Sequence, residues 1–283
     1  MTDDKSEDRK ERDSQYAKRR RAYRDAKAAQ VTAKQEARGN KGRPLLPDQV
    51  LLYGLHTVRA AMGNPDRTIM RMLATRNALA RLDISAPQSL PFPVELVAPQ
   101  AIDKLLSADA IHQGVMVEAK PLRPRPISEL KDCSLLLVLD QVTDPHNVGA
   151  IMRSAVALDA GALVTTMRHS PQESGVLAKS ASGALELIPH IQVVNLAEAI
   201  EELNALGFET IGLDSEGPEQ LEKTFSGKRI ALVLGAEGKG LRQKTRQTVK
   251  ALARLDMPGA IKSLNVSNAA AISLYAARNY LGS

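Results

Sequence analysis

Three polar stretches of this 283-residue chain hold the side chains best suited to chemistry, and each adjoins an apolar run. The first stretch, residues 140–153, contains Asn147 and, farther along a predicted helix, Arg153. A helix N-terminus is itself an anion site, so a phosphate near Arg153 would meet amide donors as well as a guanidinium. Asp144 and Pro145 equally suit a simple turn in which Asn147 caps the helix. The sequence alone leaves both interpretations open.

The second stretch, residues 235–241, reads Gly-Ala-Glu-Gly-Lys-Gly-Leu and directly follows the apolar run Ile230–Leu234. Its glycines invite comparison with phosphate-binding loops. Neither the Walker pattern nor the dinucleotide-binding pattern fits, because Gly240 is followed by Leu-Arg-Gln. What remains is a loop whose backbone a ligand can approach closely, with the Glu237 carboxylate available to a cation or a donor. A tight turn without a ligand is the alternative.

The third stretch, residues 255–268, leads into the alanine-rich segment Val266–Tyr280, whose composition predicts a helix. Ser263 and Asn265 stand directly before that segment. Ser and Asn side chains accept hydrogen bonds from the first amides of a helix, so either residue suits the N-cap position. Capping does not exclude a catalytic role, and spacing alone does not decide between the two.

The elements that must position these stretches alternate between strands and helices. Residues 46–121 form a first, small α/β unit by pattern. Its expected elements are the apolar run Leu51–Tyr53, helix His56–Met62, strand Ile69–Ala74, helix Asn77–Leu82, strand Val94–Val97, helix Pro99–Leu106 and strand Val115–Ala119. Residues 122–133 begin rich in Pro and Arg, which is typical of an extended linker between domains.

Residues 134–283 form a second unit with the same alternation. Its expected elements are strand Leu135–Leu139, helix Val148–Leu158, strand Ala162–Thr165, helix Ala197–Leu206 ending at Gly207, strands Phe208–Leu213 and Ile230–Leu234, and helix Val266–Tyr280. The continuous apolar run Leu135–Leu139 suits a strand buried on both faces. We therefore predict an α/β fold with a parallel sheet covered by helices, and ligands in loops at the carboxyl ends of its strands.

Composition excludes several classes of protein. Hydrophobic residues make up 43% and charged residues 25% of the chain, and no apolar run approaches the ~18 residues of a membrane span. The N-terminus is acidic and lacks an apolar h-region, so we expect neither a secretory signal nor a transit peptide, and a cytoplasmic location. Cys133 is the one cysteine and has no Cys or His neighbours at metal-ligand spacing. We expect it to be half-buried, and we expect no metal site.

The N-terminal tail, residues 1–45, carries the net charge. Residues 1–44 hold 14 Lys and Arg against 8 Asp and Glu, which accounts for the whole formal charge of +6. With almost no large apolar residue the tail cannot bury enough surface to fold, so we expect a disordered arm or a frayed helix. A basic arm can neutralise phosphates by counterion release without reading sequence; a solubilising tail is the alternative.

Set in order, the three polar stretches resemble the signature motifs of the SpoU family within the SPOUT methyltransferases. They read Asp-Pro-His-Asn-Val-Gly-Ala-Ile-Met-Arg at 144–153, Leu-Gly-Ala-Glu-Gly-Lys-Gly-Leu at 234–241 and Ser-Leu-Asn-Val-Ser at 263–267. Residues 53–58 and 112–115 resemble the small ribosomal-protein-like RNA-binding domain that precedes the catalytic domain in some members. The resemblance spans residues 50–283. It departs from the family at Asp256, where Pro is frequent, and at Asn268, where Val is common.

The resemblance implies S-adenosylmethionine as cofactor, a deep trefoil knot in the catalytic domain and a homodimer with its site near the interface. It implies a transfer site lined by polar side chains of all three motifs: Asn147, Arg153, Glu237, Ser263 and Asn265. It places the cofactor against the second and third motifs, at Leu234, Gly235, Gly238, Leu255, Met257 and Leu264.

The implied activity is methyl transfer to a ribose 2′-hydroxyl of structured RNA, and the small RNA-binding domain points to a guanosine of 23S ribosomal RNA. The cofactor carries an activated methyl group, so the protein must chiefly align the reactants and handle one proton. Because a guanidinium stays protonated, we expect Arg153 to bind the adjacent phosphate and stabilise alkoxide charge. The alternatives are a transfer RNA methyltransferase and a non-catalytic RNA-binding or ribosome-assembly protein.

Overall fold

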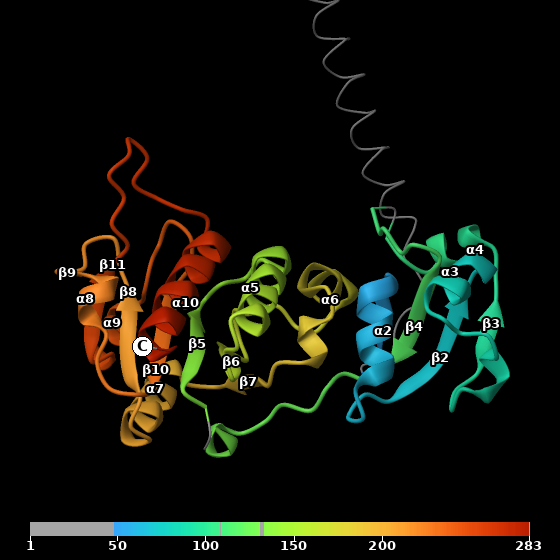
Figure 1. Ribbon diagram of the computed structural model, residues 1–283, viewed down its shortest axis with the longest axis horizontal. Helices are drawn as coiled ribbons and strands as arrows, with labels where there is room; N and C mark the ends of the chain where they lie inside the picture. Colours follow the sequence, from blue (N-terminus) through green and yellow to red (C-terminus); the bar gives the residue numbers. More distant parts are fainter. Residues whose placement is uncertain (1–47, 108, 131–132, 283) are drawn as a thin grey trace, which may run out of the picture. The chain divides into compact units, whose positions relative to one another are not determined.

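A computed structural model describes residues 48–107, 109–130 and 133–282 of the chain (Figure 1). The basic arm predicted for residues 1–45 lies outside the described residues. In the part of the chain that the structure describes, no helix is long and apolar enough to span a membrane. Cys133 is half-buried, as predicted, and its Sγ donates to the Leu135 carbonyl at 3.0 Å.

A four-stranded sheet is built from the first part of the described chain, in the order β1-β4-β2-β3. Its strands are β1 (Val50–Tyr53), β2 (Ile69–Ala74), β3 (Val94–Leu96) and β4 (Val115–Ala119). β4 pairs antiparallel with β1 and β2, and β3 pairs parallel with β2. The helices are α2 (Leu55–Gly63), α3 (Arg76–Arg81) and α4 (Pro99–Asp103), with a 3-10 turn at Pro87–Ser89. The predicted helix Pro99–Leu106 is therefore shorter than expected.

A seven-stranded sheet follows, in the order β7-β6-β5-β10-β8-β11-β9, and all its strand pairs are parallel. Its strands are β5 (Leu135–Asp140), β6 (Ala162–Thr166), β7 (His190–Val193), β8 (Glu209–Leu213), β9 (Glu219–Gln220), β10 (Ile230–Gly235) and β11 (Ala251–Arg254). Every residue of β5 is buried, because this strand has neighbours on both sides and helices on both faces. The predicted parallel α/β sheet is confirmed.

Helices cover both faces of this sheet: α5 (Pro145–Ala157), α6 (Gly175–Ala181), α7 (Leu196–Ala205), α8 (Leu221–Thr224), α9 (Gln243–Thr248) and α10 (Val266–Gly282). α5 and α10 pack against each other on one face (Figure 1). Their buried residues form one hydrophobic cluster with Leu135, Leu137 and Leu139, whereas α7 shares the opposite cluster with Leu136 and Val138. The apolar residues of β5 therefore pack against helices on both faces of the sheet, since successive strand residues point to opposite faces.

Several elements were not predicted from the sequence. α6, α8 and α9 are short, so they offer too few positions for a helical period to show. β11 reads Ala-Leu-Ala-Arg with only Ala253 buried, which gives neither an apolar run nor a clear alternation. These short elements depend on the tertiary packing that surrounds them rather than on local pattern.

Gly149 sets how closely α5 and α6 approach. A Cβ at this position would lie 2.5 Å from the Ser180 Cβ and 2.8 Å from the Ala181 amide nitrogen. Real Cβ atoms do not tolerate such distances, so the packing of the two helices requires glycine here.

A buried ion cluster ties the small sheet's connections to the second half of the chain. The Arg67 side chain is fully buried; its Nη1 binds Glu173 Oε1 at 2.6 Å and its Nη2 binds Glu186 Oε1 at 2.7 Å. Nη1 also donates to the Lys120 carbonyl at 2.7 Å. Burial raises the pKa of Glu173, because removal from water disfavours its charged form, and the nearby Glu186 carboxylate adds a smaller rise, whereas Arg67 acts in the opposite direction.

Candidate active site

The three polar stretches follow β5, β10 and β11 at the carboxyl edge of the parallel sheet. β5 and β10 are direct neighbours, with Asp140 opposite Gly235, so the first two loops leave the sheet side by side. β11 lies beyond β8 in the strand order. Ligands of open parallel sheets bind at this edge, so the topology places all three loops where a site is expected.

Asn265 joins the three loops through its side-chain amide. Its Nδ2 donates to Asn147 Oδ1 at 3.1 Å and to Glu237 Oε2 at 3.5 Å. Its Oδ1 accepts from the Ser267 amide at 2.9 Å and from the Ser267 hydroxyl at 2.6 Å. The structure thus brings together one predicted residue from each stretch. Because both ends of the Asn265 amide are bonded, its orientation is fixed.

Asp144, and not Asn147, caps α5. Its carboxylate accepts from the His146 amide at 3.0 Å, and Pro145 occupies the first helical turn, where its missing N–H costs nothing. The interpretation of Asn147 as the cap is therefore wrong, and its side chain bonds Asn265 instead. Of the two candidate caps before α10, Asn265 accepts a bond from the Ser267 amide.

Arg153 and Ser263 are not hydrogen-bonded to this cluster. Arg153 is exposed on α5, about 9 Å from Asn147 along the helix axis at a rise of 1.5 Å per residue. Ser263 is exposed in the loop that precedes α10. Within the described ranges neither side chain has a hydrogen-bond or ion-pair partner. A single chain therefore assembles three of the five predicted transfer-site residues.

The glycine loop after β10 closes on itself. Ala236 and Gly240 form a β-bridge, and the Gly240 amide donates to the Ala236 carbonyl at 2.8 Å. A Cβ on Gly235 would lie 2.1 Å from the Gly240 carbonyl carbon, so only glycine permits this contact. Residues 237–239 form the exposed tip. The loop presents backbone groups and the Glu237 carboxylate to a ligand.

The residues predicted to hold a cofactor flank this loop and the loop before α10. Leu234 is buried, Leu255 and Met257 are half-buried, and Leu264 is 39% exposed. Within the loop before α10, Lys262 Nζ donates to the Met257 carbonyl at 2.6 Å. Partly exposed apolar side chains beside an open glycine backbone suit an adenine ring with a polar tail. The individual cofactor contacts stay predictions.

Comparison with known proteins decides the family. Residues 134–275 match the model of the SpoU rRNA Methylase family, and residues 51–125 match the model of RNA 2'-O ribose methyltransferase substrate binding. The chain is 33% identical over 244 residues to the 23S rRNA (guanosine-2'-O-)-methyltransferase RlmB of Vibrio cholerae and 35% identical over 236 residues to that of Escherichia coli K12. The alignments cover 80% of this chain and 95% and 97% of those relatives.

The chain belongs to the SpoU rRNA methylase family.

Solved SpoU structures share the fold. The SpoU methyltransferase AviRb from Streptomyces viridochromogenes, in complex with the cofactor AdoMet, has a TM-score of 0.72 at 22% identity and covers 83% of this chain and 91% of its own. The AdoMet-bound rRNA methyltransferase from Sinorhizobium meliloti has a TM-score of 0.68 at 23% identity, covering 83% and 88%. The predicted family and α/β fold are confirmed. The trefoil knot and the homodimer stay predictions.

Two contacts near the SpoU motifs involve residues that the sequence patterns did not single out. Ser180 Oγ lies 3.1 Å from His146 Nδ1, and the buried Asp140 carboxylate binds Arg242. The sequence could have indicated Asp140, since a carboxylate at the end of an apolar strand that is buried on both faces is unusual. No sequence pattern indicated Ser180, because it lies in a short helix that no periodicity revealed.

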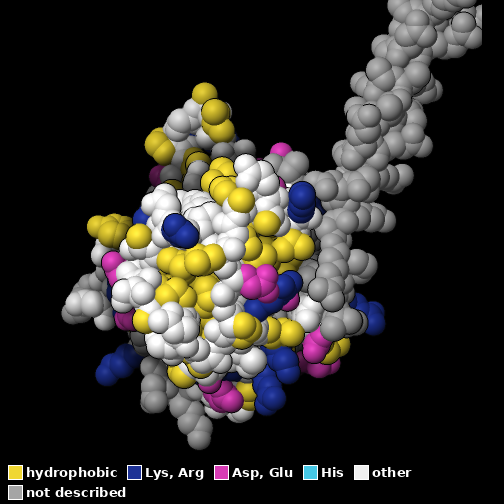
Figure 2. Space-filling view, turned by 90° about the vertical axis from the view of Figure 1, so that its right-hand side faces the viewer, with side chains coloured by type: hydrophobic (Ala, Val, Ile, Leu, Met, Phe, Trp, Pro, Cys, Tyr) yellow, Lys and Arg dark blue, Asp and Glu magenta, His cyan; other side chains and the backbone are white. Residues whose placement is uncertain are grey.

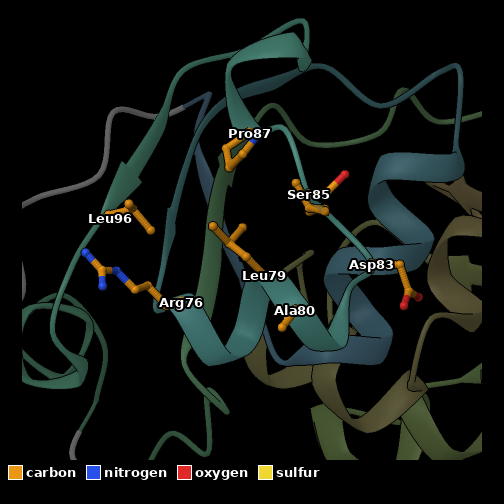
Figure 3. A pocket seen from close by; sticks show the side chains of 8 residues that line it. Arg76, Leu79, Ala80, Asp83, Ser85, Pro87 and Leu96 are labelled. Atoms are coloured by element: carbon orange, nitrogen blue, oxygen red, sulfur yellow. The ribbon is translucent and has the colours of Figure 1, made fainter.

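The segment that matches the substrate-binding model lines a pocket of about 420 Å³. Figure 2 shows hydrophobic side chains gathered on the face that carries the small sheet, with charged side chains beside them. In Figure 3, Arg76 and Leu96 lie on one side of the pocket and Ser85 and Pro87 on the other, with Leu79 between them. The Asp83 carboxylate at its rim is held by Arg59 at 3.1 Å.

Proposed function

We propose that this chain transfers the methyl group of S-adenosylmethionine to the 2′-hydroxyl of a guanosine in 23S ribosomal RNA. The observation that carries the proposal is the meeting of Asn147, Glu237 and Asn265, one residue from each SpoU motif, at the carboxyl edge of the sheet. The RlmB relatives, which this chain matches over nearly their whole length, are named for that reaction.

The residues at this edge have to align the ribose oxygen and manage one proton. When bound, the cofactor supplies a methyl group already activated by its sulfonium sulfur. The Asn147–Asn265–Glu237 network fixes the polar wall against which the ribose is held, since each side chain restrains the next. The Arg153 guanidinium would bind the RNA phosphate beside the target ribose and stabilise developing alkoxide charge, while that phosphate accepts the proton.

A homodimer explains why Arg153 stands outside the cluster. In one chain this side chain is exposed, so we place it in the site of a second copy. Two apolar residues of α10, the helix that packs on α5, support such an interface. Ile272 is 46% exposed and Tyr275 is 60% exposed. The exposed apolar side chains would then be buried between the copies.

Mixing two inactive chains tests this arrangement. Arg153→Ala and Asn265→Ala homodimers should each be inactive. In a mixed dimer one site keeps both native residues, so co-refolded chains should regain up to about half the wild-type activity per mixed dimer. Light scattering reports whether dimers form. Absence of any regained activity in proven mixed dimers would show that Arg153 acts within its own chain.

Residues 46–121 are proposed to hold the RNA, with residues 122–133 as linker and residues 134–283 as the catalytic domain. Support comes from the substrate-binding model and from the apolar pocket beside Arg76, whose guanidinium can stack on an unpaired base or bind phosphate. The basic residues 1–45 would add non-specific phosphate contacts. A ribosomal RNA substrate places the activity in the cytoplasm.

Methyl incorporation into defined RNAs tests the proposed function. With tritiated cofactor, wild-type protein should label 23S ribosomal RNA at a guanosine ribose and leave transfer RNA unlabelled. Label in transfer RNA alone would favour a transfer RNA enzyme. No label in any RNA, together with intact RNA binding, would favour a non-catalytic binding protein.

A further inference from the structure

A buried carboxylate stands at the carboxyl edge of the sheet, outside the set of residues assigned above. Asp140 ends β5, and its side chain is fully buried. Its Oδ2 accepts from the Arg242 amide at 3.0 Å, and its Oδ1 accepts from Arg242 Nε at 2.6 Å. The Arg242 side chain is 45% exposed. The Asp140 carboxylate thus accepts hydrogen bonds from both the backbone and the side chain of Arg242.

Arg242 directly follows the glycine loop, residues 235–241. Leu241 beside it is buried, and a Cβ on Gly235 would lie 2.4 Å from the Leu241 amide nitrogen. Asp140 is the residue opposite Gly235 in the pairing of β5 with β10. The two ends of the loop therefore lie side by side. Asp140, on the neighbouring strand β5, binds Arg242 at the C-terminal end of the loop.

The loop needs such an anchor because its own backbone is permissive. Gly238 and Gly240 have φ values of +77° and +64°, and residues 237–239 are exposed. Glycine loops lose much conformational entropy when they are ordered, so a loop fixed before binding binds a ligand more tightly. Only the carboxylate of this pair is buried, and the cost of removing it from water offsets much of its attraction to the partly exposed guanidinium, so we expect the pair to add little to global stability.

We propose that Asp140 and Arg242 are a positioning pair that holds the glycine loop in the shape that binds the cofactor and keeps Glu237 near Asn265. The proposal rests on the cofactor assigned above. It predicts that the pair acts on cofactor affinity through the loop, without touching the RNA.

The test compares Asp140→Asn, Arg242→Gln and Arg242→Lys in the full-length chain. Calorimetry with S-adenosylhomocysteine should give a Kd at least tenfold higher for the first two variants. Arg242→Lys keeps a cation near Asp140 and should recover most of the affinity. Hydrogen exchange of the ligand-free protein should speed up at residues 236–242 in Asp140→Asn and Arg242→Gln. The double variant should be no weaker than the single ones, because the two residues act together.

A matched control is Glu209→Gln, which also turns an acid into an amide and breaks the Lys250 Nζ–Glu209 Oε1 pair, 2.9 Å long, at the start of β8. It should leave Kd unchanged. If the loop variants lower only thermal stability or binding stoichiometry while the Kd of the folded fraction stays that of wild type, the pair is merely structural and the proposal is wrong. Because Arg242 is partly exposed, we expect its variants to fold, so they test the proposal even if Asp140→Asn does not fold. Wild-type protein that fails to bind would instead contradict the cofactor assignment.

Discussion

Asn265 does two things with one side chain, and its replacement should separate them. It bonds Asn147 and Glu237 across loops, and it caps α10 through Ser267. We expect Asn265→Ala to lower single-turnover methyl transfer about 10²–10³-fold, as for loss of one aligned polar group, while costing only about 1 kcal/mol of stability for the cap.

Asn268→Ala is the matched control, because Asn268 is exposed in the first turn of the same helix. It should turn over at a rate close to that of wild type. Rapid-quench assays and urea denaturation measure the two effects. An Asn265→Ala protein with near-normal turnover would remove the three-loop cluster from the reaction.

His190 should make stability depend on pH. Its Nε2 lies 2.9 Å from Thr165 Oγ1, and burial lowers its pKa from 6.5 to about 4. Between pH 6.5 and about 4, His190 is therefore protonated in the unfolded chain but mostly neutral in the folded chain. The free energy of unfolding should fall as the pH drops through this range. His190→Gln should flatten that part of the profile in urea denaturation. A profile equally steep in the variant would assign the loss to other groups.

The close approach of α5 to α6 depends on the absence of a side chain at Gly149. Gly149→Ala would push Cβ to 2.5 Å from the Ser180 Cβ, so we expect a loss of about 1–3 kcal/mol from overpacking. The control is Gly63→Ala at the end of α2, where nothing lies within 4 Å of an added Cβ.

Gly63→Ala should be neutral or slightly stabilising, since alanine is the better helix former. Thermal and urea unfolding of both variants make the comparison. Equal effects of the two substitutions would mean that α6 can retreat from α5 without cost. The same close packing brings Ser180 Oγ within 3.1 Å of His146 Nδ1.

The buried Arg67 cluster joins parts of the chain that are 106 and 119 residues apart in sequence. Arg67→Met would leave the Glu173 and Glu186 carboxylates buried without their cation, which should cost about 3–5 kcal/mol. The loss should shrink at low pH, because burial already raises the pKa of Glu173 and a protonated carboxyl needs no cation.

Arg125→Met provides the contrast, since the Arg125–Asp66 pair is exposed, at 49% and 64%. Its loss should cost less than about 1 kcal/mol. Chemical denaturation at neutral and acidic pH measures both variants. A small effect of Arg67→Met at neutral pH would mean that water or rearrangement replaces the guanidinium.

The long strands and helices, the order of the three motifs and the residue types in them can be read from the amino-acid sequence. These features are local: the apolar run of β5 and the alanine-rich α10 show their burial in a few consecutive residues. Family membership followed from the same linear information, because the motifs are read along the chain.

Which of these residues come into contact depends on the fold of the whole chain. The Asn147–Asn265 bond joins positions 118 apart, and the Asp140–Arg242 bonds join positions 102 apart. Such contacts depend on strand order and on the close packing of helices, which no local period encodes. For the same reason, the structure alone showed that Asp144 caps α5 and that Arg153 stands outside the cluster in a single chain.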